Sequence, residues 1–269
     1  MTNTFIRFVC SAALLGTAMA LAPSPAEGQD KPWYKSQDEW RFEVGAYLWL
    51  VRLTGTQTLG TATVPLDIKI GDVISDLKAG ATVHFEAGKG RWLGGLDVSY
   101  VNLGREDIEV SGAPPGTLAA YGFKFWQGEL FGSYRLGREL TPQRFEILLG
   151  VRGTATDTEV ELNPGSTPVT ADLKQSWADP FAGFRYSLDF TKNHRWFLVA
   201  RGDIGGIVSA DIMINAVGTL GFRISRVVDI ALAFRYLYMD YQTGTEGSSD
   251  FFKYDAASWG PLLGVGFRF

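Results

Sequence analysis

A single closed, antiparallel, transmembrane β-barrel of about ten strands is the all-β fold that this sequence predicts. Three observations support it. An apolar export-type segment lies near the N-terminus, apolar and polar residues alternate from Trp40 onward, and the 269 residues include 32 Gly, 8 Trp, 10 Tyr and 18 Phe. The mean hydropathy of +0.02 would also suit a soluble protein. The pattern along the chain therefore decides the fold class, and the average does not.

The composition excludes several classes of protein. Glycine is well above its usual share of about 7%, and 13% of the residues are aromatic. These values argue against disorder, a coiled coil or a helical membrane protein. With 25 basic against 29 acidic residues, there is no positive excess to neutralise phosphates. We therefore expect no nucleic-acid partner.

Residues 1–26 have the pattern of a secretory signal peptide, with Arg7 before an apolar run from Phe8 to Leu21. Small residues follow, and cleavage after Ala20 or after Ala26 fits equally well. A membrane anchor is the competing interpretation, but a spanning helix needs roughly 20 apolar residues, more than this run has. We expect the segment to be removed, together with the single cysteine, and residues 27–269 to form one barrel domain.

From Trp40 onward the apolar residues recur at every second position, the period of strands with two different faces. Clusters of Gly, Pro, Asn and Ser separate the runs. The expected strands cover 41–57, 62–87 (interrupted near Gly71), 91–110, 117–136, 144–162, 168–189, 195–208, 212–224, 228–242 and 250–269. An even number places both termini on the periplasmic side. Eight strands result if 53–76 is a plug or a periplasmic piece, and twelve if it holds an extra hairpin.

The distribution of side chains between the two faces distinguishes a membrane barrel from a soluble β-sandwich. One face is aliphatic and aromatic along whole strands, and the other carries Gly, Ser, Thr and opposed charges, which suits lipid outside and a narrow polar interior. Membrane-spanning strands must also close, because an open edge leaves backbone groups unpaired. Aromatic residues at strand ends fit interfacial belts: Trp40, Trp49, Trp92, Tyr100, Trp126, Tyr134, Trp196, Tyr236, Tyr238 and Trp259.

The last seven residues, Leu263 to Phe269, alternate apolar positions and end in an aromatic residue. They resemble the C-terminal strand of bacterial outer-membrane proteins. The resemblance implies an insertion signal formed by Leu263, Val265, Phe267 and Phe269, and a location in the cell outer membrane. It also implies contact with outer-membrane lipid, the barrel-assembly machinery and periplasmic chaperones. The segments 177–185 and 201–206 resemble parts of outer-membrane barrel proteins that are largely uncharacterised.

Charged residues on the inward face provide the functional hypothesis. We expect the lumen to be lined by Glu86, Asp97, Glu129, Arg135, Glu146, Arg152, Arg185, Arg201, Asp203 and Arg235. Opposite charges on neighbouring strands would form ion pairs. They either lock a closed barrel with a structural or interaction role, or line a narrow pore that filters small solutes.

Little in the sequence indicates catalysis. The chain has only two histidines; we expect His84 to face the lumen and His194 to lie in a periplasmic turn. A barrel-embedded hydrolase with His84 is the second alternative, and we do not expect an enzyme. There is no cysteine and histidine cluster of the kind that binds zinc, so we expect no metal or cofactor. The oligomeric state stays open.

Overall fold

The computed structural model describes residues 39–109, 118–137, 141–163, 169–191 and 193–269. The expected signal peptide and its two cleavage sites lie outside these ranges. Twelve strands and one helix occur in the order β1 Arg41–Trp49, β2 Arg52–Leu59, β3 Ala62–Ile68, α2 Ile70–Asp76, β4 Leu77–Lys89, β5 Trp92–Glu109, β6 Leu118–Leu136, β7 Gln143–Asn163, β8 Val169–Asp189, β9 Trp196–Gly205, β10 Ala210–Arg223, β11 Val228–Thr243 and β12 Phe252–Arg268. No helix in this described part of the chain is long and apolar enough to cross a membrane.

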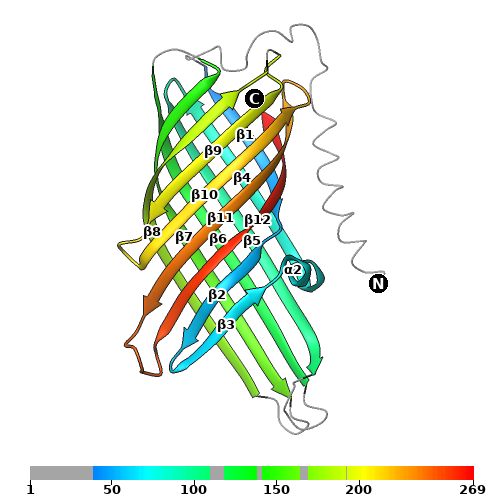
Figure 1. Cartoon of the computed structure of the whole chain (residues 1–269), viewed down its shortest axis with the longest axis vertical. Coiled ribbons are helices and arrows are strands. Elements are labelled where there is room, and N and C mark those ends of the chain that lie inside the picture. Colours follow the sequence, from blue (N-terminus) through cyan, green and yellow to red (C-terminus); the bar gives the residue numbers. More distant parts are fainter. Residues whose placement is uncertain (1–38, 110–117, 138–140, 164–168, 192) are drawn as a thin grey trace.

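Ten of the strands close into an antiparallel barrel, as predicted (Figure 1). Strands β4 to β12 pair in sequence order, and β1 lies between β4 and β12. The closing ladder places Val44 opposite Phe267 and Leu48 opposite Leu263. Every strand in the ring therefore has a neighbour on both sides over part of its length, which satisfies its backbone donors and acceptors.

The expected strand 41–57 is instead two strands, β1 and β2, and the interrupted strand expected over 62–87 is three elements, β3, α2 and β4. β2 and β3 form a hairpin that pairs with the far part of β12, and α2 leads from the hairpin to β4. Lys69 carries the backbone N–H that bonds to Asp72 at the start of α2, and such a bond satisfies a free donor at a helix end. The structure thus combines the ten-strand ring with an additional hairpin, which the sequence pattern had treated as alternatives.

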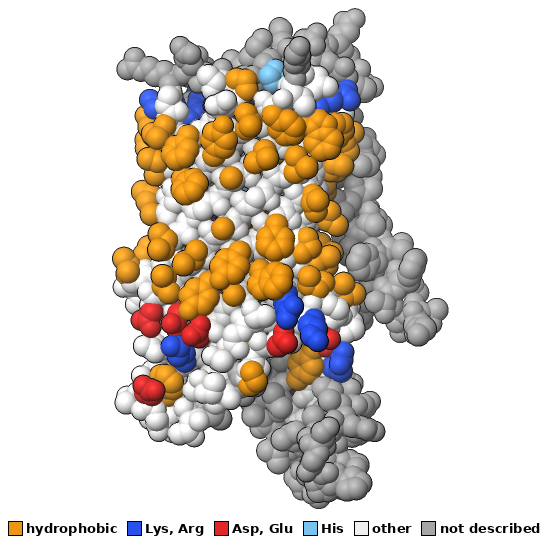
Figure 2. All heavy atoms as spheres, viewed as in Figure 1, with side chains coloured by type: hydrophobic (Ala, Val, Ile, Leu, Met, Phe, Trp, Pro, Cys, Tyr) orange, Lys and Arg blue, Asp and Glu red, His pale blue; other side chains and the backbone are white. Residues whose placement is uncertain are grey.

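The outer face of the barrel is apolar over a broad band (Figure 2). Leu130 is 66% exposed and Leu149 is 63% exposed, on neighbouring strands. The band ends where outward-facing charges begin, marked by the ion pair of 3.6 Å between Lys124 Nζ and Asp157 Oδ2. A soluble protein rarely exposes so large an apolar surface, whereas a membrane barrel has such a band on its outside.

Aromatic pairs lie near both edges of this band. The rings of Trp92 and Tyr134 are 4.6 Å apart, close to the short-turn end, and the rings of Tyr100 and Trp126 are 4.4 Å apart near the other end. Trp49 was also expected in such a belt, and this was wrong. Its ring lies 4.9 Å from the Arg235 guanidinium in the interior, because Trp49 shares the inward-facing side of β1.

Inward-facing glycines make room for rings inside the barrel. A Cβ atom on Gly95 would lie 2.2 Å from Cζ of Phe131, and one on Gly221 would lie 2.0 Å from Cζ of Phe197. No side chain fits at such distances. Glycine at these two positions thus lets an aromatic residue of the neighbouring strand lie flat against the wall.

Candidate functional site: the lumen of the barrel

The ten charged residues expected in the lumen all lie on the inward side of their strands. Eight of them are buried, and Arg152 has 0% of its side chain exposed. They come from β4, β5, β6, β7, β8, β9 and β11 and divide between two clusters, with Arg135 outside both. Arg135 faces Glu146 across the ladder, yet its Nη2 donates to the Gly90 carbonyl oxygen at 3.0 Å.

The first group, called here the central cluster, consists of Arg152, Arg201, Arg235, Glu129 and Asp203, with the amides Gln127 and Asn215. Arg152 donates to Glu129 at 2.9 Å and to Asp203 at 2.8 Å. Arg201 donates to the same two carboxylates at 2.8 and 2.9 Å. Arg235 donates to Glu129 at 2.7 Å. Three guanidinium groups thus share two carboxylates, and the contacts reach across the lumen.

Two amides complete the central cluster. Arg235 Nε donates to Asn215 Oδ1 at 2.8 Å, and Asn215 Nδ2 donates to Asp203 Oδ2 at 2.8 Å. Gln127 Oε1 accepts a bond of 3.1 Å from Arg235. The charge pattern did not identify these amides, since they carry no charge to pair. Their inward register was the available signal, because Gln127 lies two residues before Glu129.

The second group, called here the lower cluster, lies nearer the short turns and consists of Glu86, Asp97, Glu146, Arg185 and His84. Arg185 Nη2 is 2.5 Å from Glu146, and its Nη1 bonds to Glu86. The His84 ring faces two carboxylates, with Nε2 3.2 Å from Glu86 and Nδ1 3.2 Å from Asp97. His84 therefore lies in the lumen as a hydrogen-bonding partner.

Asp97 was expected to pair with an arginine, but its contacts lie elsewhere. Tyr47 Oη donates to both carboxylate oxygens of Asp97, at 2.9 and 3.0 Å. Tyr47 was not selected from the sequence, where it is one of the ten tyrosines of the chain. Its position opposite Thr82 in the β1–β4 ladder brings its hydroxyl to the next strand.

Aromatic rings cover the guanidinium groups of the central cluster. Arg201 lies 5.2 Å from the ring centre of Phe131 and 5.3 Å from that of Phe181, and Arg152 lies 4.8 Å from Phe181. A cation over a ring face is favourable, and the rings also keep water away. Both phenylalanines face inward and are buried, so the inward face is not purely polar.

The half of the lumen away from the short turns is filled by apolar side chains, contrary to the expectation of a polar interior throughout. The Trp177 and Tyr241 rings stack at 4.4 Å with an angle of 8°, and both are buried. A ring of ten strands encloses a narrow channel, which large inward-facing side chains can fill. The buried apolar residues near this end include Leu53, Met213, Leu237, Met239, Phe252, Tyr254 and Ala256.

A cavity with both charged and apolar side chains in its wall occupies the other half. Its volume is about 300 Å³. Near the short turns it is lined by Arg223, Asp229 and Arg268, and at its inner end by Arg201 and Arg235. Two ion pairs of 2.8 Å, Arg223 with Asp189 and Arg268 with Asp229, stand at its outer rim. The cavity, called here the vestibule, therefore reaches from the short-turn end to the central cluster.

Within the described ranges, no group of three or more His, Cys, Asp or Glu side chains has an arrangement that could hold a metal ion. The lower cluster contains His84 and three carboxylates, but arginine occupies two of these. The second histidine, His194, lies in the turn between β8 and β9, as expected, and has a left-handed backbone with φ of 52°. Asn193 in the same turn accepts a bond from the Arg195 backbone.

A comparison with protein-family models and with curated proteins returns no match. Solved barrels are similar in structure. Ail, the attachment invasion locus protein of Yersinia pestis, has 11% identity and a TM-score of 0.35, and the alignment covers 86% of this chain and 99% of Ail. The outer membrane protease OmpT of Escherichia coli has 9% identity and a TM-score of 0.45, and the alignment covers 87% of this chain and 97% of OmpT.

The translocator domain of the autotransporter NalP from Neisseria meningitidis has 10% identity and a TM-score of 0.44, with coverage of 99% of this chain and 98% of that domain. None of the three TM-scores exceeds 0.45, so the roles of those proteins are not transferred to this chain. The strand pairing of the chain itself carries the assignment of the fold. Its closed ten-strand ring, apolar outer band and charged interior are the architecture of an outer-membrane β-barrel protein.

Proposed function

We propose that this chain is an integral protein of the bacterial outer membrane with a structural or interaction role and a lumen closed to solutes. The observation that carries the proposal is the central cluster. Arg152, fully buried, joins Glu129 of β6 to Asp203 of β9. A water-filled pore would leave such groups hydrated, whereas here they bond to one another. Beyond them, buried apolar side chains fill the other half of the lumen.

Planar-bilayer recording tests the closed lumen. Purified protein, inserted at high loading, is expected to give no discrete conductance steps. Insertion is verified on the same sample by heat-modifiable electrophoretic migration, in which a folded barrel and its boiled form migrate differently. Discrete steps of reproducible size from the inserted protein would overturn the closed lumen.

A small-solute channel is the second candidate, and the vestibule favours it. Its volume of about 300 Å³ and its charged wall would suit the first half of a pathway that opens when the central cluster rearranges. A channel of this kind predicts conductance steps whose ion selectivity changes in Arg152→Ala or Arg201→Ala, because each change removes a positive charge from the narrowest part. Unchanged selectivity in both variants would exclude this pathway.

We also propose that the chain has no catalytic role. Both ring nitrogens of His84 face carboxylates, which leaves neither ring nitrogen to take a proton from a nucleophilic hydroxyl. The hydrolase alternative requires turnover of a lipid or peptide that disappears in His84→Ala. Such turnover, retained in the control His194→Ala, would contradict the proposal.

A further inference from the structure

The barrel wall contains a seam in the half away from the short turns. β1 pairs with β4 only from Arg41 to Tyr47, and beyond this point the chain continues into β2 and β3, which follow β12. Among the described strands, β3 pairs only with β2, and β4 before Thr82 pairs only with β5. Two strand edges thus face each other across the seam, with α2 beside it (Figure 1).

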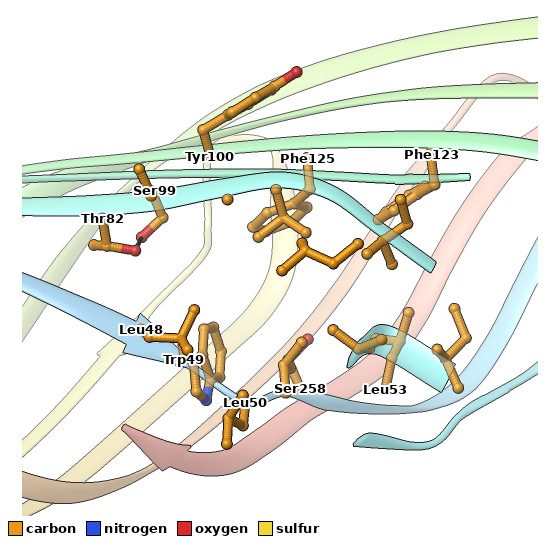
Figure 3. A pocket seen from close by; sticks show the side chains of 18 of the residues that line it. Leu48, Trp49, Leu50, Leu53, Thr82, Ser99, Tyr100, Phe123, Phe125 and Ser258 are labelled. Carbon is orange, nitrogen blue, oxygen red and sulfur yellow. Dashed lines mark hydrogen bonds between the residues drawn. The ribbon is translucent and has the colours of Figure 1, made fainter. Parts of the chain in front are cut away.

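An apolar pocket lies behind the seam. Its volume is about 70 Å³, several times the ~15 Å³ that one water needs. In Figure 3, Trp49 and Leu53 on one side point toward Phe123 and Phe125 on the other. The lining contains residues from both faces of the wall. Inward-facing are Trp49, Leu53, Val101, Leu103, Phe123 and Phe125, and outward-facing are Leu48, Leu50 and Ala81.

Among the polar groups in this wall, the buried indole Nε1 of Trp49 has no hydrogen-bond partner in the described part of the chain, whereas Thr82 and Ser99 bond to each other. Thr82 Oγ1 and Ser99 Oγ form a buried hydrogen bond of 3.2 Å (Figure 3). They offer little to a polar ligand. A dry apolar cavity of this kind binds apolar groups, because filling it restores contacts that its walls lack.

The helix α2 covers the pocket and is anchored by one carboxylate. Val73 and Ile74 line the pocket, with Val73 buried and Ile74 55% exposed. Asp76, at the end of α2, accepts a bond of 2.9 Å from Arg105 Nε on β5 and a bond from the Tyr121 hydroxyl on β6. The cover is therefore fixed to the wall on one side of the seam.

The pocket is continuous with the lipid-facing surface. Ala81 lies opposite Tyr100 in the β4–β5 ladder, and Tyr100 belongs to the aromatic pair near the edge of the apolar band that is farther from the short turns. The outward charges of Lys124 and Asp157 mark the end of that band. The seam therefore opens at the depth where hydrocarbon chains meet the polar boundary of the membrane.

We propose that the pocket binds the terminal part of one hydrocarbon chain of a membrane lipid, which enters through the seam between β3 and β4 beneath α2. The proposal rests on the membrane location proposed above. Its occupant follows from continuity with the apolar band, where lipid chains are the neighbouring molecules. The inward residues Leu103 and Phe125 would then contact lipid although they lie behind the barrel wall.

Photolabelling tests this contact. The full protein is reconstituted in vesicles of phosphatidylcholine that carries a diazirine near the end of one acyl chain, illuminated, and mapped by mass spectrometry. We expect labels on Leu103 and Phe125 as well as on Leu130 and Leu149 of the outer band. Val101→Trp fills the pocket and is expected to lower labelling of Leu103 and Phe125 about tenfold, since close-packed space admits no second group.

Two further variants control for folding. Gly80→Leu adds a side chain into the pocket, with its first carbon 3.3 Å from the flexible end of Leu77, and is expected to act like Val101→Trp. Val98→Trp lies on the same strand but faces outward, and should leave labelling of Leu103 unchanged. All variants are checked for heat-modifiable migration before labelling.

The outcomes separate this proposal from the membrane location. Labelled Leu130 and Leu149 with unlabelled Leu103 and Phe125 would overturn only the pocket site. Labels on Leu103 that persist in both filled variants would also overturn it. An unlabelled outer band would overturn the membrane location itself. A third arm adds a diazirine fatty acid from solution, and labelling of Phe125 by this probe alone would exclude a membrane lipid as the source.

Discussion

Arg152 Nε donates to Glu129 Oε1 at 2.9 Å, and its Nη2 donates to Asp203 Oδ1 at 2.8 Å. One buried guanidinium therefore connects β7 to β6 on one side and to β9 on the other. Each carboxylate also receives Arg201. In a wall held by backbone pairs between neighbours, this contact adds a link across the interior between strands that do not pair directly.

Arg152→Ala is expected to lower the free energy of unfolding by about 3–5 kcal/mol, the range for breaking a buried ion pair and leaving its partners behind. Urea denaturation of the reconstituted protein measures the change. The matched control is Arg52→Ala, whose pair with Asp67 has 36% and 58% of the side chains exposed. That change should cost about 1 kcal/mol or less. Equal losses in the two variants would contradict a cross-lumen link.

Gly95→Ala is expected to destabilise the barrel by about 1–3 kcal/mol through overpacking. The new Cβ would lie 2.2 Å from Phe131 Cζ, and moving that buried ring disturbs its contact with Arg201. The control is the neighbouring Gly94→Ala, which faces outward and has its nearest atom, the Phe131 carbonyl oxygen, at 3.9 Å. Thermal unfolding of both variants in the same detergent compares them. A Gly94 variant as unstable as the Gly95 variant would point to backbone propensity instead of packing.

The anchor of α2 predicts a pH dependence. Burial raises the pKa of the Asp76 carboxyl, but bonds from Tyr121, Ser75 and Arg105 outweigh this and hold the pKa below its ordinary value. A carboxyl whose pKa is lower in the folded state stabilises the fold above its unfolded pKa of about 3.9, and the contribution is lost as pH falls through the folded value. Protection of α2 should therefore be constant between about pH 5 and 8 and decline below about pH 4.

Hydrogen exchange of residues 70–76, followed by mass spectrometry, measures this protection. Asp76→Asn removes the charge. It is expected to lower the protection of α2 at neutral pH to the value that the parent protein shows in acid. Asp67→Asn, an exposed carboxylate on β3, serves as the control and should leave α2 unchanged. If neither acid nor Asp76→Asn changes the protection of α2, the helix is held by Val73 packing alone.

The alternation of residues predicted most of the fold because a strand with two environments must repeat at every second position. The expected range 228–242 differs by one residue from β11, Val228–Thr243. The segment after Trp49 was less predictable. Its residues alternate equally well in one long strand or in a hairpin, and only the pairing with β12 decides between them.

The charged residues of the lumen were predictable individually, but their partners were not. Period two places Glu129 and Arg235 on the inside, yet they meet across the barrel at 2.7 Å from strands that are far apart in the ring. The inward-facing apolar residues among these charges were missed for a related reason. Phe131 and Leu148 lie between charged positions on the inward face, and a pattern based on charge treats them as interruptions.

The closure of the ring at β1 gives the last prediction. At Ala46, β1 is paired on both sides: Ala46 lies opposite Val83 of β4 and opposite Val265 of β12. Proline there removes a ladder hydrogen bond whichever way the amide points. Ala46→Pro is therefore expected to abolish the heat-modifiable form in membrane fractions.

Thr63→Pro provides the matched control. β3 is paired on one side only and already contains Pro65. Thr63, two residues away, points its amide to the same open side. This variant should keep the heat-modifiable form. Retention of that form in Ala46→Pro would show that the β1–β12 ladder is dispensable, and its loss in Thr63→Pro would show that the hairpin edge is needed to close the wall.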